Sequence, residues 1–173
     1  AYSPAASAAT VLPSITFSVA TSLSAVPPFT IGFTNLTAGV VTNGAATAEI
    51  GLSTNSVNGG VVYVKSGGSL ASAMAGSSIT SATADLSVAA TGYGAIVTSA
   101  SQSSGGPFAA AAPFNGAGNN VGVLQTVLQN VLTTPGSVTT GLASVTLKAK
   151  VDAITPSATD YTDTLTFVAA MLY

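Results

Sequence analysis

The chain has 173 residues, enough for one β-sandwich or barrel, and only 5% of them are charged against about 25% in an ordinary domain. The net charge is −2, and the three basic residues are all Lys, which excludes the basic surface that a nucleic-acid-binding protein needs. With no His and no Cys, the usual general bases, thiol nucleophiles and transition-metal ligands are missing. We therefore expect a protein that is not an enzyme and needs no cofactor.

The first residues, AYSPAASAAT, do not have the charged and then apolar segments of a signal peptide. We expect a mature chain whose signal peptide has been removed, and hence an extracellular or cell-surface location. The mean hydropathy of +0.60 is high, but no apolar run approaches the roughly 18 residues of a spanning helix. A surface of Ser, Thr, Ala and Gly suits a protein that packs against copies of itself, although an ordinary secreted surface domain would have the same composition.

The N-terminal third predicts an arm and then strands. Residues 1–13 are rich in Ala and Pro and predict an extended arm, because proline restricts the backbone and lacks an N–H group. In residues 14–21 apolar and small polar residues alternate, which predicts a half-buried strand. A second alternating stretch, 29–33, follows the Pro27–Pro28 break.

The middle of the chain predicts more short strands and one long loop. Residues 59–68 form a strand pattern bounded by Gly pairs, and Tyr93, Ala95 and Val97 share one face of another. The stretch 101–120 is rich in Gly, Pro and Asn but contains Phe108 and Phe114, so we expect a folded loop whose two Phe side chains dock on the sandwich.

Two patterns dominate the C-terminal third. Leu124, Val127, Leu128 and Val131 recur at three- and four-residue spacing, which predicts one short helix near 121–132. In 145–153 apolar residues alternate with polar ones, and we expect the face that carries Lys148 and Lys150 to lie outside the core.

The last alternating stretch, 161–173, predicts a closing strand. Short strands with turn residues every ten residues or so predict an all-β fold: a single β-sandwich, Ig-like or jelly-roll-like, over residues 14–173, with an N-terminal arm at 1–13 and the one short helix.

Few residues qualify as a chemical site. A Ser–Lys dyad using one of the lysines is less favoured than lysines on a solvated strand face. Asp152, Asp160 and Asp163 could ligate Ca²⁺ together, but they lack the spacing of a known calcium loop. Asn35 begins an Asn-Leu-Thr acceptor pattern for N-glycosylation.

The two ends of the chain suggest a way to assemble. A donated strand must be extended, apolar at alternate positions and flexibly tethered, and residues 9–21 meet this description. We expect Val11, Ile15, Phe17 and Val19 to occupy a groove of a neighbouring subunit, bordered there by the 161–173 strand. The alternative is that 14–21 is the first strand of its own domain, and which of the two terminal strands is donated stays open.

The ending YTDTLTF, residues 161–167, resembles the closing strand of secreted fibre-forming β-sandwiches such as the spore-coat-U-like subunits of archaic chaperone–usher pili. The predicted architecture is also similar to camelysin/TasA-like biofilm fibre subunits and archaeal bundling pili, which have an N-terminal donor strand. Unlike chaperone–usher subunits, this chain has no cysteine. The resemblance implies a self-assembling extracellular filament of identical subunits and no catalytic residue.

The first expectation is therefore a structural filament subunit joined by donor-strand complementation. The second is a monomeric cell-surface adhesin or carbohydrate-binding sandwich, which would need exposed aromatic residues. Its candidates are Tyr63, Tyr93, Phe108 and Phe114. A secreted hydrolase is the third and is disfavoured by the missing bases.

Overall fold

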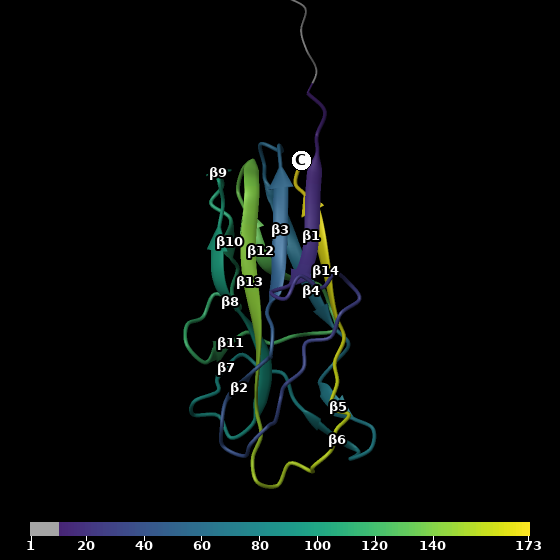
Figure 1. Ribbon diagram of the computed structural model, residues 1–173. Helices are drawn as coiled ribbons and strands as arrows, with labels where there is room; N and C mark the ends of the chain where they lie inside the picture. Colours follow the sequence, from purple (N-terminus) through teal and green to yellow (C-terminus); the bar gives the residue numbers. More distant parts are fainter. Residues whose placement is uncertain (1–10) are drawn as a thin grey trace, which may run out of the picture.

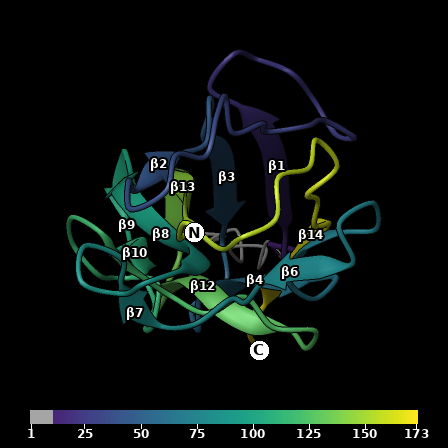
Figure 2. The same ribbon diagram turned by 90° about the horizontal axis from the view of Figure 1, so that it is seen from below.

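The protein is all-β, with two curled antiparallel sheets packed face to face (Figures 1 and 2). The structure, a computed structural model, describes residues 11–173, and it shows no helix there, so none that could span a membrane. The strands are β1 (Ile15–Thr21), β2 (Thr42–Asn43), β3 (Ala48–Thr54), β4 (Gly60–Ser66), β5 (Leu70–Ser72), β6 (Ser77–Ile79), β7 (Ala84–Asp85), β8 (Gly92–Ser101), β9 (Ser104–Gly105), β10 (Ala109–Ala110), β11 (Asn120–Val121), β12 (Gln129–Thr134), β13 (Val138–Lys150) and β14 (Leu165–Met171).

Strand β13 is the centre of the larger sheet. It pairs with β3 and β2 along one side and with β8 and β9 along the other, and β1 is added outside β3. The smaller sheet has the order β10-β12-β4-β14. Two short hairpin-like pairs, β5–β6 and β7–β11, lie toward the end of the sandwich opposite the N-terminal arm (Figure 1).

The core forms between the two sheets from the alternate residues of each strand. In β3 and β13 the inward positions Ile50, Leu52, Val145 and Ala149 are almost completely buried, as the period of two requires. The predicted shared face of Tyr93, Ala95 and Val97 is confirmed, because all three lie in this core. The all-β fold is thus confirmed together with most of its strand pattern.

The long stretch 101–120 is a folded loop, as predicted. Phe108 and Phe114 are both buried in the core. The loop also joins the two sheets by backbone hydrogen bonds, from Val97 N to Phe114 O at 2.9 Å and from Ala111 N to Val131 O at 3.0 Å. One long edge of the sandwich is therefore closed by main-chain contacts.

The helix predicted near 121–132 is wrong. The chain there forms β11, an extended segment and then β12, which pairs with β4. Of the four residues that suggested a helical face, Leu124 and Val131 are buried, but Val127 and Leu128 are exposed. Leu124 reaches the core from the extended segment and Val131 from β12, so the three- and four-residue spacing of the four apolar residues does not correspond to one buried face.

The face of β13 that carries Lys148 and Lys150 was expected to lie outside the core and in solvent, but it is not solvated, since both lysines are only 8% exposed. Two chain segments, one around Ser87 and one around Asn119, cover the lysine-bearing face of β13 at this point. Lys148 Nζ donates to Asn119 Oδ1 at 3.0 Å, and Lys150 Nζ donates to the carbonyl of Ser87 at 3.2 Å. The two lysines thus fasten a covering layer to the sheet.

The segment predicted to be donated is paired within its own chain. Residues 15–21 form β1, which is matched to β3 at seven successive positions from Ile15–Thr54 to Thr21–Ala48. The alternative considered from the sequence, a first strand of the same domain, therefore describes the single chain. Of the predicted arm, residues 1–10 lie outside the described residues, and 11–13 continue from β1 without regular structure.

We predict that Lys148→Ser destabilises the protein by about 1–3 kcal/mol, because Asn119 loses its charged donor and the covering segment loses a contact. Lys65→Ser is the matched control, because Lys65 is exposed on β4, and it should change the unfolding free energy by about 0.5 kcal/mol or less. Urea unfolding of both variants measures the difference, and equal effects would show that the covering segment is not held by Lys148.

Candidate functional site

The candidate site is the second long edge of the sandwich, where β1 ends the larger sheet and β14 ends the smaller one. The two strands touch across this edge and lie beside each other in Figure 1. Among the described residues no backbone hydrogen bond joins them, in contrast to the closed edge at Phe114. Each strand therefore presents one unpaired row of backbone N–H and C=O groups.

Strand β1 contributes three of the residues predicted for polymerisation. Phe17 and Val19 are half-buried and pack against the core, whereas Ile15 is 37% exposed. The neighbouring strand β3 alternates between buried and half-buried positions along its whole length. Only Thr21 of β1 is fully buried, so β1 is held mainly by its backbone pairing to β3.

Strand β14 forms the other border. It pairs with β4 from Leu165–Ser66 to Met171–Gly60, and its inward residues Leu165, Phe167 and Ala169 are half-buried against the core. Its sequence contains no charge, proline or bulge of the kind that usually protects an edge strand.

Val11 lies on the described part of the arm and is 80% exposed, so it is not seated in a groove of its own chain. The arm is tied down just before β1 by Asn55, whose Oδ1 accepts from Ser14 N and whose Nδ2 donates to Leu12 O, both at 2.8 Å. Sequence analysis gave Asn55 no role, because its contacts lie about forty positions away along the chain.

The connection after β1 has the properties of a hinge. Residues 22–28 are all exposed, and the next segment is anchored because Phe29, Ile31 and Phe33 pack against the core. The chain turns back on itself at Thr21, whose Oγ1 accepts from Leu23 N and Ala25 N. We define residues 22–28 as the hinge; its length was visible in the sequence, but its isolation from the core was not.

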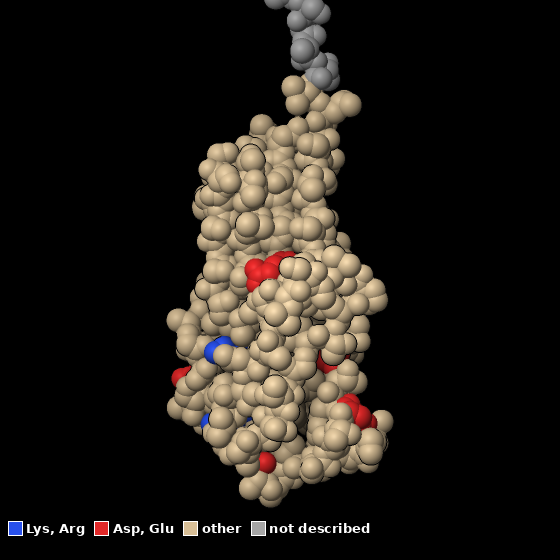
Figure 3. Space-filling view, in the orientation of Figure 1, with Lys and Arg blue, Asp and Glu red and all other residues tan. Residues whose placement is uncertain are grey.

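The end of the sandwich from which the arm leaves carries no charged residue. It is built from 11–17, 52–60, 100–106, 134–142 and 168–173, and Figure 3 shows it as a continuous uncharged surface. Exposed apolar side chains gather on it: Val11, Leu12, Val57, Leu142, Val168, Leu172 and Tyr173. We call it the uncharged end.

The remaining site candidates do not form one centre. Asn35 is exposed on the loop between β1 and β2 and is therefore accessible to a glycosylating enzyme. Tyr93, Phe108 and Phe114 are core residues, so they are not available as a ligand-binding surface. Burial raises the pKa of the Tyr93 phenol, and the Asp163 carboxylate adds to this rise.

The acidic residues are used in turns. Asp163 accepts from Ser66 Oγ and Gly67 N, Asp160 accepts from Ser72 Oγ and Met74 N, and Asp152 accepts from Thr155 Oγ1. Within residues 11–173 no three acidic side chains meet as a metal-binding group, so the calcium alternative has no site there.

We predict that acid weakens the protein partly through Asp160. The hydrogen bond from Ser72 and then that from Met74 N lower the pKa of Asp160 below its ordinary value of 3.8. This contribution to stability is complete above the ordinary pKa and is lost as the pH falls through the lowered folded-state pKa. Asp160→Asn should therefore reduce the urea midpoint at about pH 7 more than at about pH 2. An equal reduction at both pH values would mean that the charge of Asp160 does not contribute.

Comparison with known proteins gives no assignment for this arrangement. No family model, no curated protein and no solved structure matches the chain. The open edge, the hinge and the uncharged end are therefore the features on which a function has to be based.

Proposed function

We propose that the protein is the structural subunit of an extracellular filament, in which identical copies are joined by strand complementation at the β1 edge. The observation that carries the proposal is the incomplete edge between β1 and β14, where half-buried core residues lie beside unpaired backbone groups. Such an edge is a template for a strand of another chain.

The single chain fills its own β1 position, so assembly would proceed by exchange. A β1 strand that leaves loses up to seven ladder positions with β3, and it regains the same ones on the β3 strand of another copy. Each ladder hydrogen bond contributes about 0.5–1.5 kcal/mol in either place, so these terms cancel. The balance is then set by the hinge and by the new contacts between copies.

The hinge and the uncharged end both favour association. Opening the hinge exposes no large core surface, because residues 22–28 are already exposed and Phe29 begins the anchored segment. It breaks two hydrogen bonds, from Ser22 N to Thr47 O and from Thr47 N to Ser22 Oγ. The uncharged end offers several exposed apolar side chains and no like charges to oppose contact between copies. Burial of one such side chain contributes about 1.5–3 kcal/mol, which supports an interface that stays formed on dilution.

The likeness of residues 161–167 to fibre-forming sandwiches supports the same function, with β14 as a second candidate for the exchanged strand. In this proposal the subunit is secreted, homopolymeric and non-catalytic.

We predict that locking β1 in its own sheet prevents filament formation. The chain has no cysteine, so Thr16→Cys with Ser53→Cys introduces one pair at matched positions of β1 and β3. Cross-strand Cα atoms lie about 4.5–5.5 Å apart, within disulfide range. Oxidised before assembly, this variant should form no filaments under the electron microscope, and reduction should restore them. Oxidised after assembly, it should give a ladder of covalent multimers on a non-reducing gel.

The matched control is Lys65→Cys with Thr166→Cys, which locks β14 to β4 at two paired positions that are both exposed. It should assemble normally, and a block by this pair alone would identify β14 as the exchanged strand. If the locked β1 variant forms filaments that contain only intrachain disulfides, β1 is not the exchanged strand, although the proposal of a filament still holds. Isolated particles from the wild-type protein under all conditions would refute the filament itself.

A further inference from the structure

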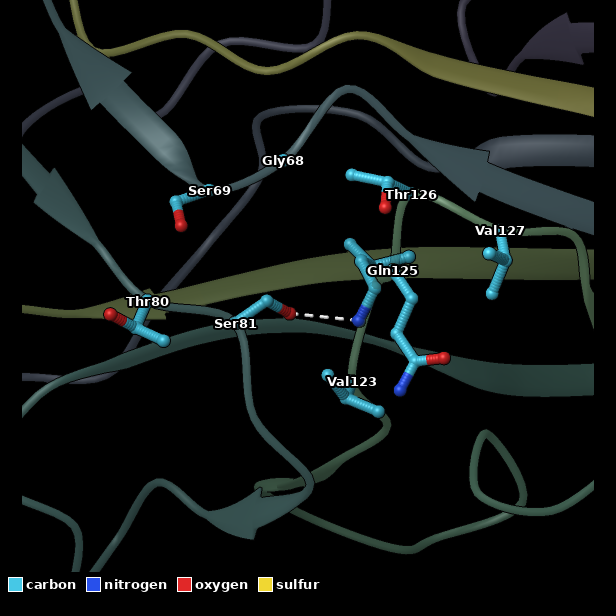
Figure 4. Close-up of a pocket in the computed structure, with 9 residues that line it drawn as sticks. Gly68, Ser69, Thr80, Ser81, Val123, Gln125, Thr126 and Val127 are labelled. Atoms are coloured by element: carbon cyan, nitrogen blue, oxygen red, sulfur yellow. Dashed lines mark hydrogen bonds between the residues drawn. The ribbon is translucent and has the colours of Figure 1, made fainter.

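A groove of about 420 Å³ lies between the β5–β6 hairpin and the extended segment before β12. Its walls come from residues 68–69, 80–81 and 123–127, as Figure 4 shows. The volume is enough for a small ligand, but the groove is shallow and open to solvent, so a bound ligand would keep much of its surface in water. The groove is lined by residues outside β1, β14 and the hinge, so it is separate from the edge proposed for assembly.

Hydrogen bonds to neighbouring strands and loops hold the walls of the groove in place. Ser81 Oγ donates to Tyr93 O and accepts from Leu124 N, both at 2.8 Å, and Leu124 itself is buried. Gln125 is held through its backbone, because its O accepts from Ser66 N at 2.8 Å and its N donates to Gln129 Oε1 at 2.9 Å. The groove is therefore formed before any ligand arrives.

The side chains that line it are neutral. Ser69, Thr80 and Thr126 supply hydroxyl groups, Gln125 supplies a carboxamide, and Val123 and Val127 supply aliphatic surface. In Figure 4 the one hydrogen bond among the lining residues is that of Ser81, so the other polar groups make none with one another. Hydroxyl and carboxamide groups can both donate and accept hydrogen bonds.

We propose that this groove binds a neutral saccharide. No charged residue lines it, so an ionic ligand would lose its hydration without gaining a counter-ion. No aromatic side chain lines it, so neither a nucleobase nor a sugar ring has an aromatic surface to stack on. Unlike the aromatic carbohydrate-binding surface considered from the sequence, this groove would hold a ligand by hydrogen bonds and aliphatic contact. A sugar ring matches what is present, because its hydroxyl groups pair with the four polar side chains and its C–H groups pack on Val123 and Val127.

The test is a titration of the ¹⁵N-labelled protein with cellohexaose, maltohexaose and N-acetylchitohexaose, and with anionic hexagalacturonate for comparison. At least one neutral hexasaccharide should shift the amide resonances of 68–69, 80–81 and 123–127 with saturation, and hexagalacturonate should not. Thr80→Val with Thr126→Val removes two hydroxyl groups and should weaken binding about tenfold. Thr16→Val with Thr166→Val, the same change at exposed strand positions, should leave it unchanged.

Three results would overturn the proposal. The first is that no neutral hexasaccharide shifts any amide resonance at concentrations up to about 10 mM. The second is that the shifted resonances lie outside the groove, and the third is that the two double variants bind the saccharide with equal affinity. Groove shifts that appear on raising the protein concentration without sugar would assign the groove to a contact between copies instead. None of these NMR measurements requires filaments. The saccharide site and the filament proposal are therefore tested independently.

Discussion

Strand β13 carries the larger sheet, because every other strand of that sheet except β1 is hydrogen-bonded to it. Its inward residues, such as Val145 and Ala149, fill the core, while Lys148 and Lys150 on the opposite face hold the segments that cover it. Residues 145–150 of β13 are buried on both faces and paired on both sides, so this part of the strand cannot move without loss of the core and the covering layer together. The rest of the molecule is arranged around this fixed centre, and its freedom increases with distance from it.

The two long edges show that gradient. At the edge formed by β8 and β10, the loop that contains Phe108 and Phe114 crosses between the sheets and hydrogen-bonds to both. At the other edge, within residues 11–173, β1 and β14 are joined by no backbone hydrogen bond, and their inward side chains pack against the core. Backbone groups that find no partner within a chain can find one in another chain, which is why the assembly proposal belongs to this edge. In that proposal the hinge lets β1 change partners without disturbing β13.

The few charged residues of the chain are unevenly distributed over the sandwich. Asp152, Asp160 and Asp163 bind hydroxyl or backbone N–H groups of nearby turns. These three carboxylates therefore hold loops at one end of the sandwich, whereas the opposite end carries no charged residue (Figure 3). A neutral surface attracts few ligands by long-range electrostatics, so recognition has to rest on shape, hydrogen bonds and apolar contact, as proposed above for the open edge and for the groove.

The sequence by itself determined the all-β class, most of the strands and the docking of Phe108 and Phe114, because a period of two and two Phe in a Gly-rich loop are local signals. It could not determine which face of β13 is covered, since Lys148 is buried by segments distant in the chain. It predicted a helix at 121–132 wrongly, because the pairing of β12 with the distant strand β4, which local spacing does not reveal, decides the structure there. It found the alternation of β1 but not its partner, and it missed Asn55 and the isolation of the hinge. Strand pairing, like the covering of a face, joins residues far apart in the chain, and so only the tertiary structure decided them.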